Sequence, residues 1–238
     1  IVSFSFSSVD EKISALFEPG VPAPQERLNT LSILKKEGIP CGMFLLPVIP
    51  FVSDTPALIE GAVAKANEMG AAYVIFGGMT LKEGRQKEYF MNVLKKHYPQ
   101  LRGTYEHIYR GDKWGGATSE YYDSIHQVFN IVANHFKIPK RIPLYLFQDI
   151  LDENDLVVVM LEHIDYLLKL QGGKSPYGYA AYVLSKIKEP LSAMKGELSK
   201  IKGVGWATQK IILEILETGR SSYYEKLSAN NKMSGFGI

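Results

Sequence analysis

Short apolar segments alternate with amphipathic helical patterns along the first hundred residues, and this alternation constrains the fold more than any other feature of the chain. Residues 1–7 alternate apolar and serine side chains, and residues 41–48 form an almost continuous apolar run. A third apolar segment follows at residues 71–76. Strands separated by helices pair in parallel through right-handed connections, because each helix packs back onto the sheet. We therefore predict an α/β unit with three parallel strands.

Helical patterns fill the intervals between these strands. The helix after the first strand should end at Gly38, because glycine favours the left-handed conformation that ends many helices. Thr55 is expected to cap the next helix, which ends near Met69, and another helix is expected at residues 82–96. Three strands complete neither a closed barrel nor a doubly wound sheet, so we expect this unit to be part of a larger fold.

From about residue 152 onward the sequence has no convincing strand pattern, and its periodicity predicts helices at about residues 153–170, 178–187, 189–201 and 207–217. A proline-bracketed link at residues 138–143 precedes this part, and domain boundaries fall in such links. We therefore predict an all-α second domain. The predicted domains are an α/β part with a helical extension at residues 1–143 and a helical part at residues 144–238, with a frayed tail from about residue 229.

Composition and charge exclude several classes of protein. The 238 residues are 46% apolar and 22% charged, which excludes a disordered or fibrous chain. Lys plus Arg (27) and Asp plus Glu (25) nearly balance, so any nucleic-acid or membrane site must be a local patch. The single cysteine excludes an internal disulfide, and the sequence contains neither a membrane-span pattern nor a signal-peptide pattern. We expect a cytoplasmic protein with no membrane partner.

Two glycines flank one apolar residue, Val204, between two predicted helices. This spacing is typical of a tight hairpin whose backbone amides face outward at the N-terminus of the second helix. Such amides, together with the helix dipole, bind an anion, so a duplex phosphate can bind there without any base contact. The alternative is a helix–helix turn with no ligand. The candidate nucleic-acid-binding residues are Lys200, Lys202, Gly203, Val204, Gly205, Trp206 and Lys210.

The sequence around this hairpin resembles the N-terminal helix-hairpin-helix domain of family X DNA polymerases. The similarity is carried by residues 162–172, 175–182, 201–205 and 215–220. The resemblance implies DNA binding through phosphates without sequence preference. It also implies a monovalent cation held by backbone carbonyls, here those of Ser199, Ile201 and Val204.

Some members of that family also remove a deoxyribose phosphate through a Schiff base on a lysine of the helix after the hairpin. In this sequence Ile211 occupies that position, and Lys210 precedes it. A shift of one residue turns a helical side chain by about 100°. Lys210 is therefore expected to point elsewhere, which argues against lyase activity.

Residues 1 to about 110 resemble the C-terminal half of a radical S-adenosylmethionine barrel, in the branch of spore photoproduct lyase and the DNA-repair photolyase-like proteins. The similarity is carried by residues 2–10, 18–28, 34–39, 47–54 and 70–71. In that family three cysteines bind a [4Fe–4S] cluster that cleaves S-adenosylmethionine to a radical. This chain has only Cys41, a small core residue by its context, and one thiolate cannot hold such a cluster.

The resemblance also implies residues that would bind S-adenosylmethionine. Ser5 would offer its hydroxyl to the ribose or the methionine group. Arg27 would pair with the methionine carboxylate in a bidentate fork, or alternatively form an ion pair with Glu18 or Glu26. The backbone of the apolar stretch at residues 46–51 would contact adenine, and the position of Asp54 is also that of an ordinary loop residue. The candidate cofactor-binding residues are Ser5, Arg27, Pro47, Ile49 and Asp54.

These observations predict a fragment of a radical S-adenosylmethionine enzyme that acts on nucleic acid, in DNA repair or modification. Because the chain begins at Ile1 inside an expected strand, we expect the first half of the barrel to be missing from it. S-adenosylmethionine and the [4Fe–4S] cluster would belong to the full-length protein, and this chain alone would bind neither. The alternative is a DNA-binding module with a non-catalytic barrel remnant. A Cys-x-x-x-Cys-x-x-Cys triplet encoded upstream would distinguish the two.

Overall fold

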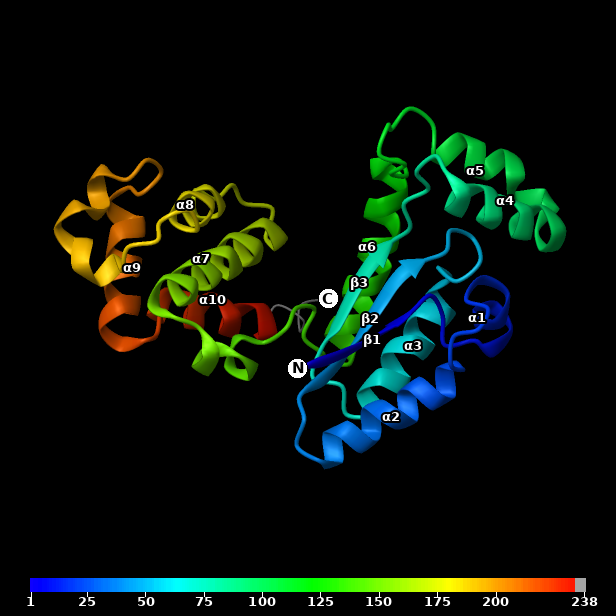
Figure 1. Cartoon of the computed structure of the whole chain (residues 1–238), viewed down its shortest axis with the longest axis horizontal. Helices are drawn as coiled ribbons and strands as arrows, with labels where there is room; N and C mark the ends of the chain where they lie inside the picture. Colours follow the sequence, from blue (N-terminus) through cyan, green and yellow to red (C-terminus); the bar gives the residue numbers. More distant parts are fainter. Residues whose placement is uncertain (234–238) are drawn as a thin grey trace. The chain divides into compact units, whose positions relative to one another are not determined.

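The chain forms two compact units, and each is described by itself (Figure 1). The computed structural model describes residues 1–233, and the side chains of residues 1–228. The first unit spans Ile1–Leu146, and the second begins at Phe147. This division lies close to the boundary that we expect after residue 143. No helix in the described part of the chain is both long enough and apolar enough to cross a membrane.

A parallel sheet organises the first unit. Its strands β1 (Val2–Phe6), β2 (Cys41–Val48) and β3 (Val74–Gly78) are neighbours in their order along the chain. The three predicted parallel strands are therefore confirmed. The third strand starts later than expected, because the N–H of Ala71 closes the end of the preceding helix by donating to the Ala66 carbonyl. Among the described residues the sheet is open and not closed into a barrel.

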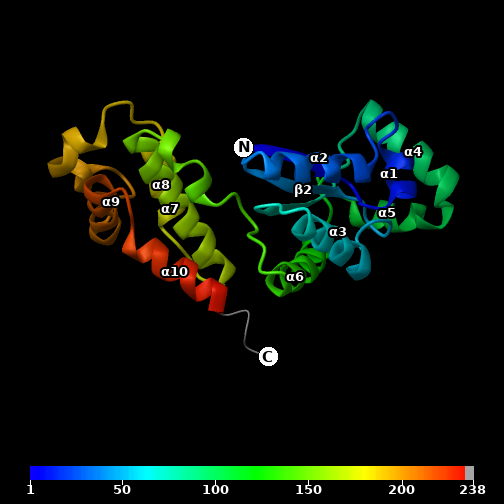
Figure 2. The ribbon, with the colours of Figure 1, turned by 90° about the horizontal axis from the view of Figure 1, so that it is seen from below.

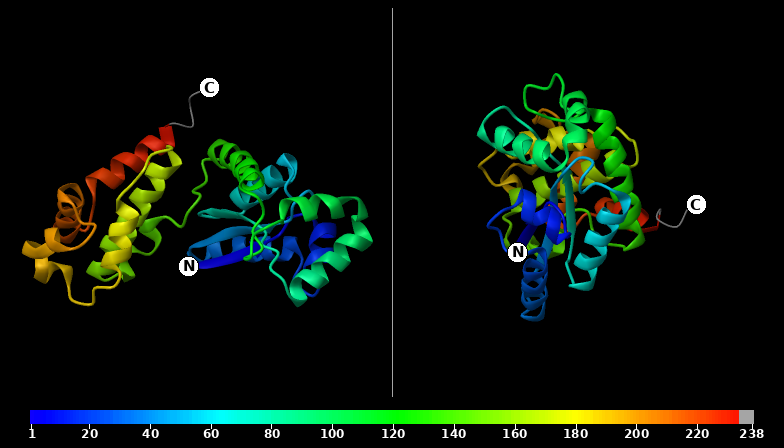
Figure 3. Two further views of the ribbon diagram at one scale, coloured as in Figure 1. Left: turned by 90° about the horizontal axis from the view of Figure 1, so that it is seen from above. Right: turned by 90° about the vertical axis from the view of Figure 1, so that its right-hand side faces the viewer.

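Helices α2 (Pro24–Lys36) and α3 (Pro56–Glu68) connect the strands, and α6 (Ser119–His135) packs against α3 and β3 (Figures 2 and 3). The Thr55 hydroxyl caps α3 by accepting a hydrogen bond from the Leu58 N–H, as predicted. One core cluster joins these helices to the sheet, and the rings of Phe76 and Phe129 stack in it with centroids 4.5 Å apart. The burial of these apolar side chains stabilises the packing of the helices on the sheet. Because the strands are parallel, their carboxyl ends lie at the same edge of the sheet.

A tyrosine ring lies directly against the backbone of β2. Tyr73 is fully buried, and a Cβ on Gly42 would collide with its ring. The Tyr73 hydroxyl forms a 2.6 Å hydrogen bond with the hydroxyl of Ser3 on β1. Gly42 therefore allows an approach between ring and strand that no other residue permits.

Three further α-helices belong to the first unit. α1 (Glu11–Phe17) is capped by the Asp10 side chain, which accepts from two backbone N–H groups, and it is too short for the sequence pattern to predict. α4 (Arg85–His97) starts after Gly84, whose φ of 140° is not helical. α4 and α5 (Arg102–Ile108) pack over a small second core that contains Tyr105 and Leu94.

The second unit is helical, as predicted, and Figure 2 shows its helices packed together. Its elements are α7 (Glu153–Leu170), α8 (Tyr177–Leu184), the 3-10 segment η4 (Leu191–Lys200), α9 (Trp206–Thr218) and α10 (Ser222–Met233). The helix expected at residues 189–201 is instead the 3-10 segment, with non-helical dihedrals at Met194. Its hydrogen bonds join residues three apart, as from the Ala193 N–H to the Pro190 carbonyl.

Helix α10 was not expected from the sequence. It overlaps the start of the frayed tail predicted from about residue 229, and the rest of that tail, residues 234–238, lies outside the described residues.

Candidate nucleic-acid interface

The hairpin between η4 and α9 is a tight turn in which only glycine fits at residue 203. Gly203 has a φ of 89°, a left-handed conformation that residues with a Cβ rarely adopt. A Cβ there would also lie 2.7 Å from the Tyr179 ring of α8. Val204 is buried, and its N–H donates to the Ile201 carbonyl at 3.0 Å. The turn is therefore closed by a backbone hydrogen bond and seated against α8.

The N-terminus of α9 opens from this turn. Gly205 is its N-cap, with an extended backbone and no side chain to cap the helix. The first intrahelical hydrogen bond runs from the Gln209 N–H to the Gly205 carbonyl at 2.9 Å. The backbone N–H groups before Gln209 therefore have no acceptor within the helix. A Cβ on Gly205 would meet only open space, so the approach to these groups is open. The free N–H groups, the helix dipole and the open approach together form an anion site.

Lysines and an indole surround this anion site. Lys200, Lys202 and Lys210 are exposed. Lys200 lies 3.4 Å from Glu197, but both side chains are exposed, so this ion pair is weak and can be exchanged for a phosphate. Trp206, the first residue of α9, is 78% exposed, and the Lys210 ammonium lies 5.8 Å from its ring centroid. The two residues also line a surface cavity of about 490 Å³ along α9. All seven predicted residues lie between residues 200 and 210, at the end of η4, in the turn and in the first part of α9.

The three carbonyls expected to hold a cation belong to the end of η4 and to the turn that follows it. The Ile201 carbonyl already accepts the Val204 N–H, which leaves one of its lone pairs for another contact. Ser199 lies at the end of η4, and Val204 leads into α9. A cation site at Ser199, Ile201 and Val204 stays a prediction.

Two polar residues that the sequence did not indicate hold this scaffold together: the buried Asp165 and the half-buried Asn154. Burial by itself would raise the pKa of Asp165, but Lys169, Ser175 and the Gly178 N–H outweigh it and lower that pKa below its ordinary value. Asn154 bonds the Ile187 and Glu189 carbonyls and accepts the Leu191 N–H, which fastens the link between α8 and η4 to α7. Neither residue belongs to a motif, because each role depends on contacts distant in sequence.

The tyrosines of α8 divide into one buried and two exposed side chains. Tyr177 packs in the core, whereas Tyr179 and Tyr182 are exposed, and Lys186 lies 5.1 Å from the Tyr182 ring centroid. Tyr179 is also the side chain that contacts the hairpin at Gly203. Exposed aromatic and cationic side chains are therefore found at the hairpin and also on α8 and just after its end.

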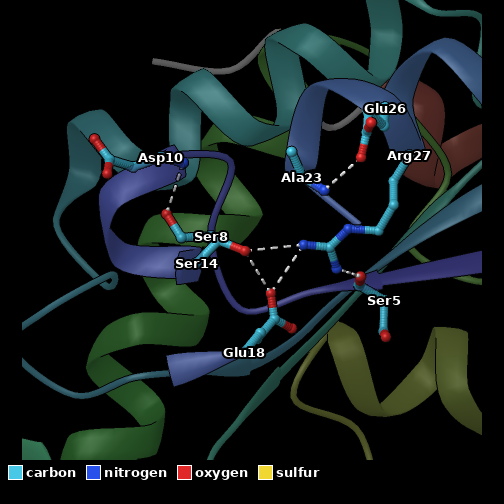
Figure 4. A network of polar contacts seen from close by, with 8 residues as sticks. All are labelled: Ser5, Ser8, Asp10, Ser14, Glu18, Ala23, Glu26 and Arg27. Atoms are coloured by element: carbon cyan, nitrogen blue, oxygen red, sulfur yellow. Dashed lines mark hydrogen bonds and ion pairs between the residues drawn. The ribbon is translucent and has the colours of Figure 1, made fainter. Parts of the chain in front are cut away.

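In the first unit, Arg27 is part of the internal structure. Its side chain is buried, and it donates to the Ser5 carbonyl at 2.6 Å, to Glu18 at 2.9 Å and to the Ser14 hydroxyl at 3.0 Å (Figure 4). Its guanidinium also lies 4.6 Å from the Phe6 ring centroid. Of the alternatives weighed for Arg27, the structure has the ion pair with Glu18, and that pair is buried instead of lying on a helix surface. A fork to a ligand carboxylate would have to displace these partners.

Glu26 has a different role from the one considered for it. Its carboxylate accepts the Ala23 N–H at 2.9 Å and so helps to cap α2 (Figure 4). Of the two carboxylates considered as partners of Arg27, the structure has the ion pair with Glu18, and Glu26 caps α2 instead.

The remaining cofactor candidates lie at or beyond the carboxyl ends of β1 and β2. Ser5 and Pro47 are exposed there. Ile49 is buried, and its N–H donates to the Ser53 hydroxyl, so its side chain serves the core. Asp54 accepts the Tyr121 hydroxyl at 2.9 Å, which is the role of a loop residue that supports the fold.

Cys41 does not suit an iron–sulfur cluster. Its Sγ is buried and donates to the Leu31 carbonyl at 3.4 Å, and burial raises the pKa of the thiol, which opposes the thiolate that iron binds. The described residues contain no group of three or more His, Cys, Asp or Glu side chains arranged to hold a metal ion. The residues of this chain therefore do not fit the [4Fe–4S] cluster.

Comparison with known protein families assigns the second unit. The profile of the helix-hairpin-helix domain family matches residues 152–221. This stretch is a helix-hairpin-helix domain. The match spans α7 through α9 and contains the hairpin at Gly203–Gly205. The comparisons give no support to the radical S-adenosylmethionine resemblance of the first unit.

The chain is also similar to longer proteins. The uncharacterized protein Rv2578c of Mycobacterium tuberculosis is 28% identical over 109 residues, which cover 46% of this chain and 32% of that protein. The uncharacterized protein ORF301 of Acidianus two-tailed virus is 28% identical over 97 residues, which cover 40% of this chain and 32% of that protein. The matched stretch is about a third of the length of these relatives. No solved structure matches the chain significantly.

Proposed function

We propose that the helix-hairpin-helix domain binds duplex DNA through its phosphates, without reading the base sequence. The observation that carries this proposal is the open N-terminus of α9 at Gly205, where free backbone N–H groups face solvent beside exposed lysines. Backbone N–H groups at a helix end contact phosphate oxygens and carry no base information. The binding should therefore depend on salt far more than on sequence.

The test is the affinity of the chain for labelled duplexes of unrelated sequence over a range of salt concentrations. Gly205→Pro removes one N–H at the anion site and is compatible with the Gly205 φ of −81°, so the fold should persist. We expect weaker binding to every duplex by this variant. Lys202→Ala and Lys210→Ala should each reduce the slope of log affinity against log salt by about one.

Lys188→Ala is the matched control, because Lys188 is an exposed lysine of the same unit outside the hairpin. It should leave both affinity and slope nearly unchanged. The proposal fails if Gly205→Pro, Lys202→Ala and Lys210→Ala bind duplex DNA as the unmodified chain does.

We propose, as a second function, that residues 1–143 form the later part of a radical S-adenosylmethionine barrel whose whole protein acts on nucleic acid. The support is the consecutive order of β1, β2 and β3, which is that of neighbouring strands in a (β/α) barrel, and the exposed Ser5 and Pro47 at their carboxyl ends. The cluster that generates the radical would bind to cysteines outside this chain.

The gene sequence before Ile1 tests this second proposal. It should encode a strand followed by Cys-x-x-x-Cys-x-x-Cys, and the full-length protein purified without oxygen should hold iron and sulfide in a four-to-four ratio, as a [4Fe–4S] cluster requires. If no such triplet is encoded, the first unit is a scaffold for the DNA-binding domain.

A further inference from the structure

A second surface with the chemistry of nucleic-acid binding lies in the first unit, on the loop at residues 109–118 between α5 and α6, which we call the Trp114 loop (Figure 1). Trp114 is 62% exposed. The ammonium groups of Lys82 and Lys113 lie 5.0 and 5.2 Å from its ring centroid. An indole that is largely in solvent between two cations has no role in the core of the unit.

Hydrogen bonds within the loop fix the backbone of Trp114. The Asp112 carboxylate accepts the Trp114 N–H at 3.0 Å and the Gly116 N–H at 2.7 Å. These two backbone hydrogen bonds lower the pKa of Asp112 below its ordinary value, so the carboxylate stays ionised and keeps its two partners near neutral pH. A turn that is built in this way fixes the backbone of Trp114 before any ligand arrives, which reduces the entropy lost on binding.

The loop is also attached to the segment that follows β3. The Leu81 N–H donates to the Gly115 carbonyl at 2.6 Å. Gly115 has a φ of 75°, and a Cβ there would collide with the backbone of Leu81 and Lys82. This contact brings Lys82 beside Trp114, although the two residues are distant in sequence. It also places both beyond the carboxyl end of β3, the edge of a parallel sheet at which ligands bind.

We propose that Trp114 stacks on an unpaired base of single-stranded DNA, while Lys82 and Lys113 contact the flanking phosphates. Every base has an aromatic face that can stack on the indole, and the adjacent ammonium groups match the negative charge of the backbone. An intact duplex does not expose a base face in its interior, so this site distinguishes unpaired from paired DNA. The inference deepens the proposed nucleic-acid binding and rests on it, but it uses no residue of the hairpin.

The chain contains two tryptophans, so Trp206→Phe leaves Trp114 as the single fluorescent indole. In this background we expect an oligothymidine strand to quench the fluorescence of Trp114, and a blunt duplex of equal length to leave it nearly unchanged. Trp114→Ala in the unmodified chain should weaken binding of the single strand by about 5- to 150-fold, the range that corresponds to the loss of one stacked base. Binding of the blunt duplex should not change.

Two further variants separate stacking from folding. Asp112→Asn keeps the indole but can accept only one of the two N–H groups, so it should weaken single-strand binding while the thermal unfolding of the unit changes little. Ile131→Ala is the matched control, because Ile131 is an apolar side chain of α6 that is 65% exposed, and its loss should leave single-strand binding unchanged. Lys82→Ala and Lys113→Ala should each flatten the salt dependence of single-strand binding.

The two proposals fail separately. Unquenched Trp114 together with unchanged single-strand affinity of Trp114→Ala would overturn the stacking site, even if Gly205→Pro had lost its affinity for duplex DNA. Conversely, normal duplex binding by Gly205→Pro would overturn the hairpin site while quenching of Trp114 by the single strand still supported this one. Equal quenching by single strand and blunt duplex would contradict selection for unpaired bases.

Discussion

The anion site at the start of α9 and the buried network around Arg27 both contain donors suited to a negative group, but they use them differently. In the network, Arg27 donates to Glu18, to Ser14 and to the carbonyl of Ser5, all within the protein. At the start of α9, the donors are backbone N–H groups beside a glycine with open space around it. The comparison shows that the partners of a donor, and not its residue type, separate a structural network from a binding site.

The largest expected effect is on Arg27, whose side chain is only 7% exposed. Arg27→Met should lower the free energy of unfolding of the first unit by about 3–5 kcal/mol, because it leaves the partly buried Glu18 carboxylate without its ion-pair partner. Duplex binding by the second unit should persist wherever that unit is folded. Urea denaturation in the Trp206→Phe background, followed by Trp114 fluorescence, measures the first unit. Arg102→Ala is the control, since its ion pair with Glu106 is exposed and should contribute less than about 1 kcal/mol.

If the network were a ligand site instead, Arg27→Met would leave stability nearly intact. The variant Arg27→Met/Glu18→Leu, which removes both charges, should recover part of the lost stability. Absence of any recovery would contradict the ion pair as the source of the effect.

The next effect concerns the two glycines of the hairpin, which differ in what a side chain would meet. Gly203→Ala should destabilise the second unit by about 1–3 kcal/mol, because its φ is positive and its Cβ would press on Tyr179. Gly205→Ala should change stability by less than about 1 kcal/mol, since its backbone is extended and the space is open. Thermal unfolding of both variants in a Trp114→Phe background, followed by Trp206 fluorescence, compares the two. Similar losses for both variants would show that the turn is not seated against α8.

A smaller effect should appear as a pH dependence of the second unit. The folded state lowers the pKa of Asp165, so its contribution to stability is complete above the ordinary value of 3.8 and is lost as the pH falls through the lowered folded value. Asp165→Asn should therefore flatten the loss of stability below about pH 4. Urea unfolding in a Trp114→Phe background at a series of acidic pH values, followed by Trp206 fluorescence, gives the slopes. Equal slopes for both proteins would exclude Asp165 as a source of acid sensitivity.

The smallest effect is expected at the exposed pair of Lys200 and Glu197. Glu197→Ala should leave the free energy of unfolding within about 1 kcal/mol of its original value, because exposed ion pairs contribute little. It should nevertheless tighten duplex binding slightly, since it removes a negative charge beside the anion site and frees Lys200. Binding measured at low salt would detect this. Weaker binding would mean that Lys200 needs Glu197 to hold its position.

The sequence predicted those parts of the molecule whose cause is local. The strands, α3 with its Thr55 cap, and α7 follow from periodicity and capping, and the Gly203 turn follows from a conformation that glycine favours. Of the partners of Arg27, only Glu18 was among the alternatives that the sequence offered. The Ser5 carbonyl and the Ser14 hydroxyl could not be predicted in the same way, because they reach Arg27 only after β1, α1 and α2 have packed.

The same limit applies to the Trp114 loop and to η4. The sequence marks the loop as rich in glycine, but only the folded chain brings Lys82 beside the indole. The apolar spacing of residues 191–200 fits a helix, yet the structure has a 3-10 segment there, and the N–H of its first residue, Leu191, donates to the Asn154 side chain of α7. In each case contacts between distant residues decide among local structures that the sequence alone permits.

The approach of Tyr73 to the backbone at Gly42 has a consequence for evolution. Because the ring occupies the space of any side chain at residue 42, the two positions share one volume. Relatives of this chain should therefore vary at both positions together, with a small residue at position 73 wherever position 42 carries a side chain. Since the ring also bonds Ser3 of β1, such a pair of exchanges should be accompanied by the loss of a hydroxyl at position 3.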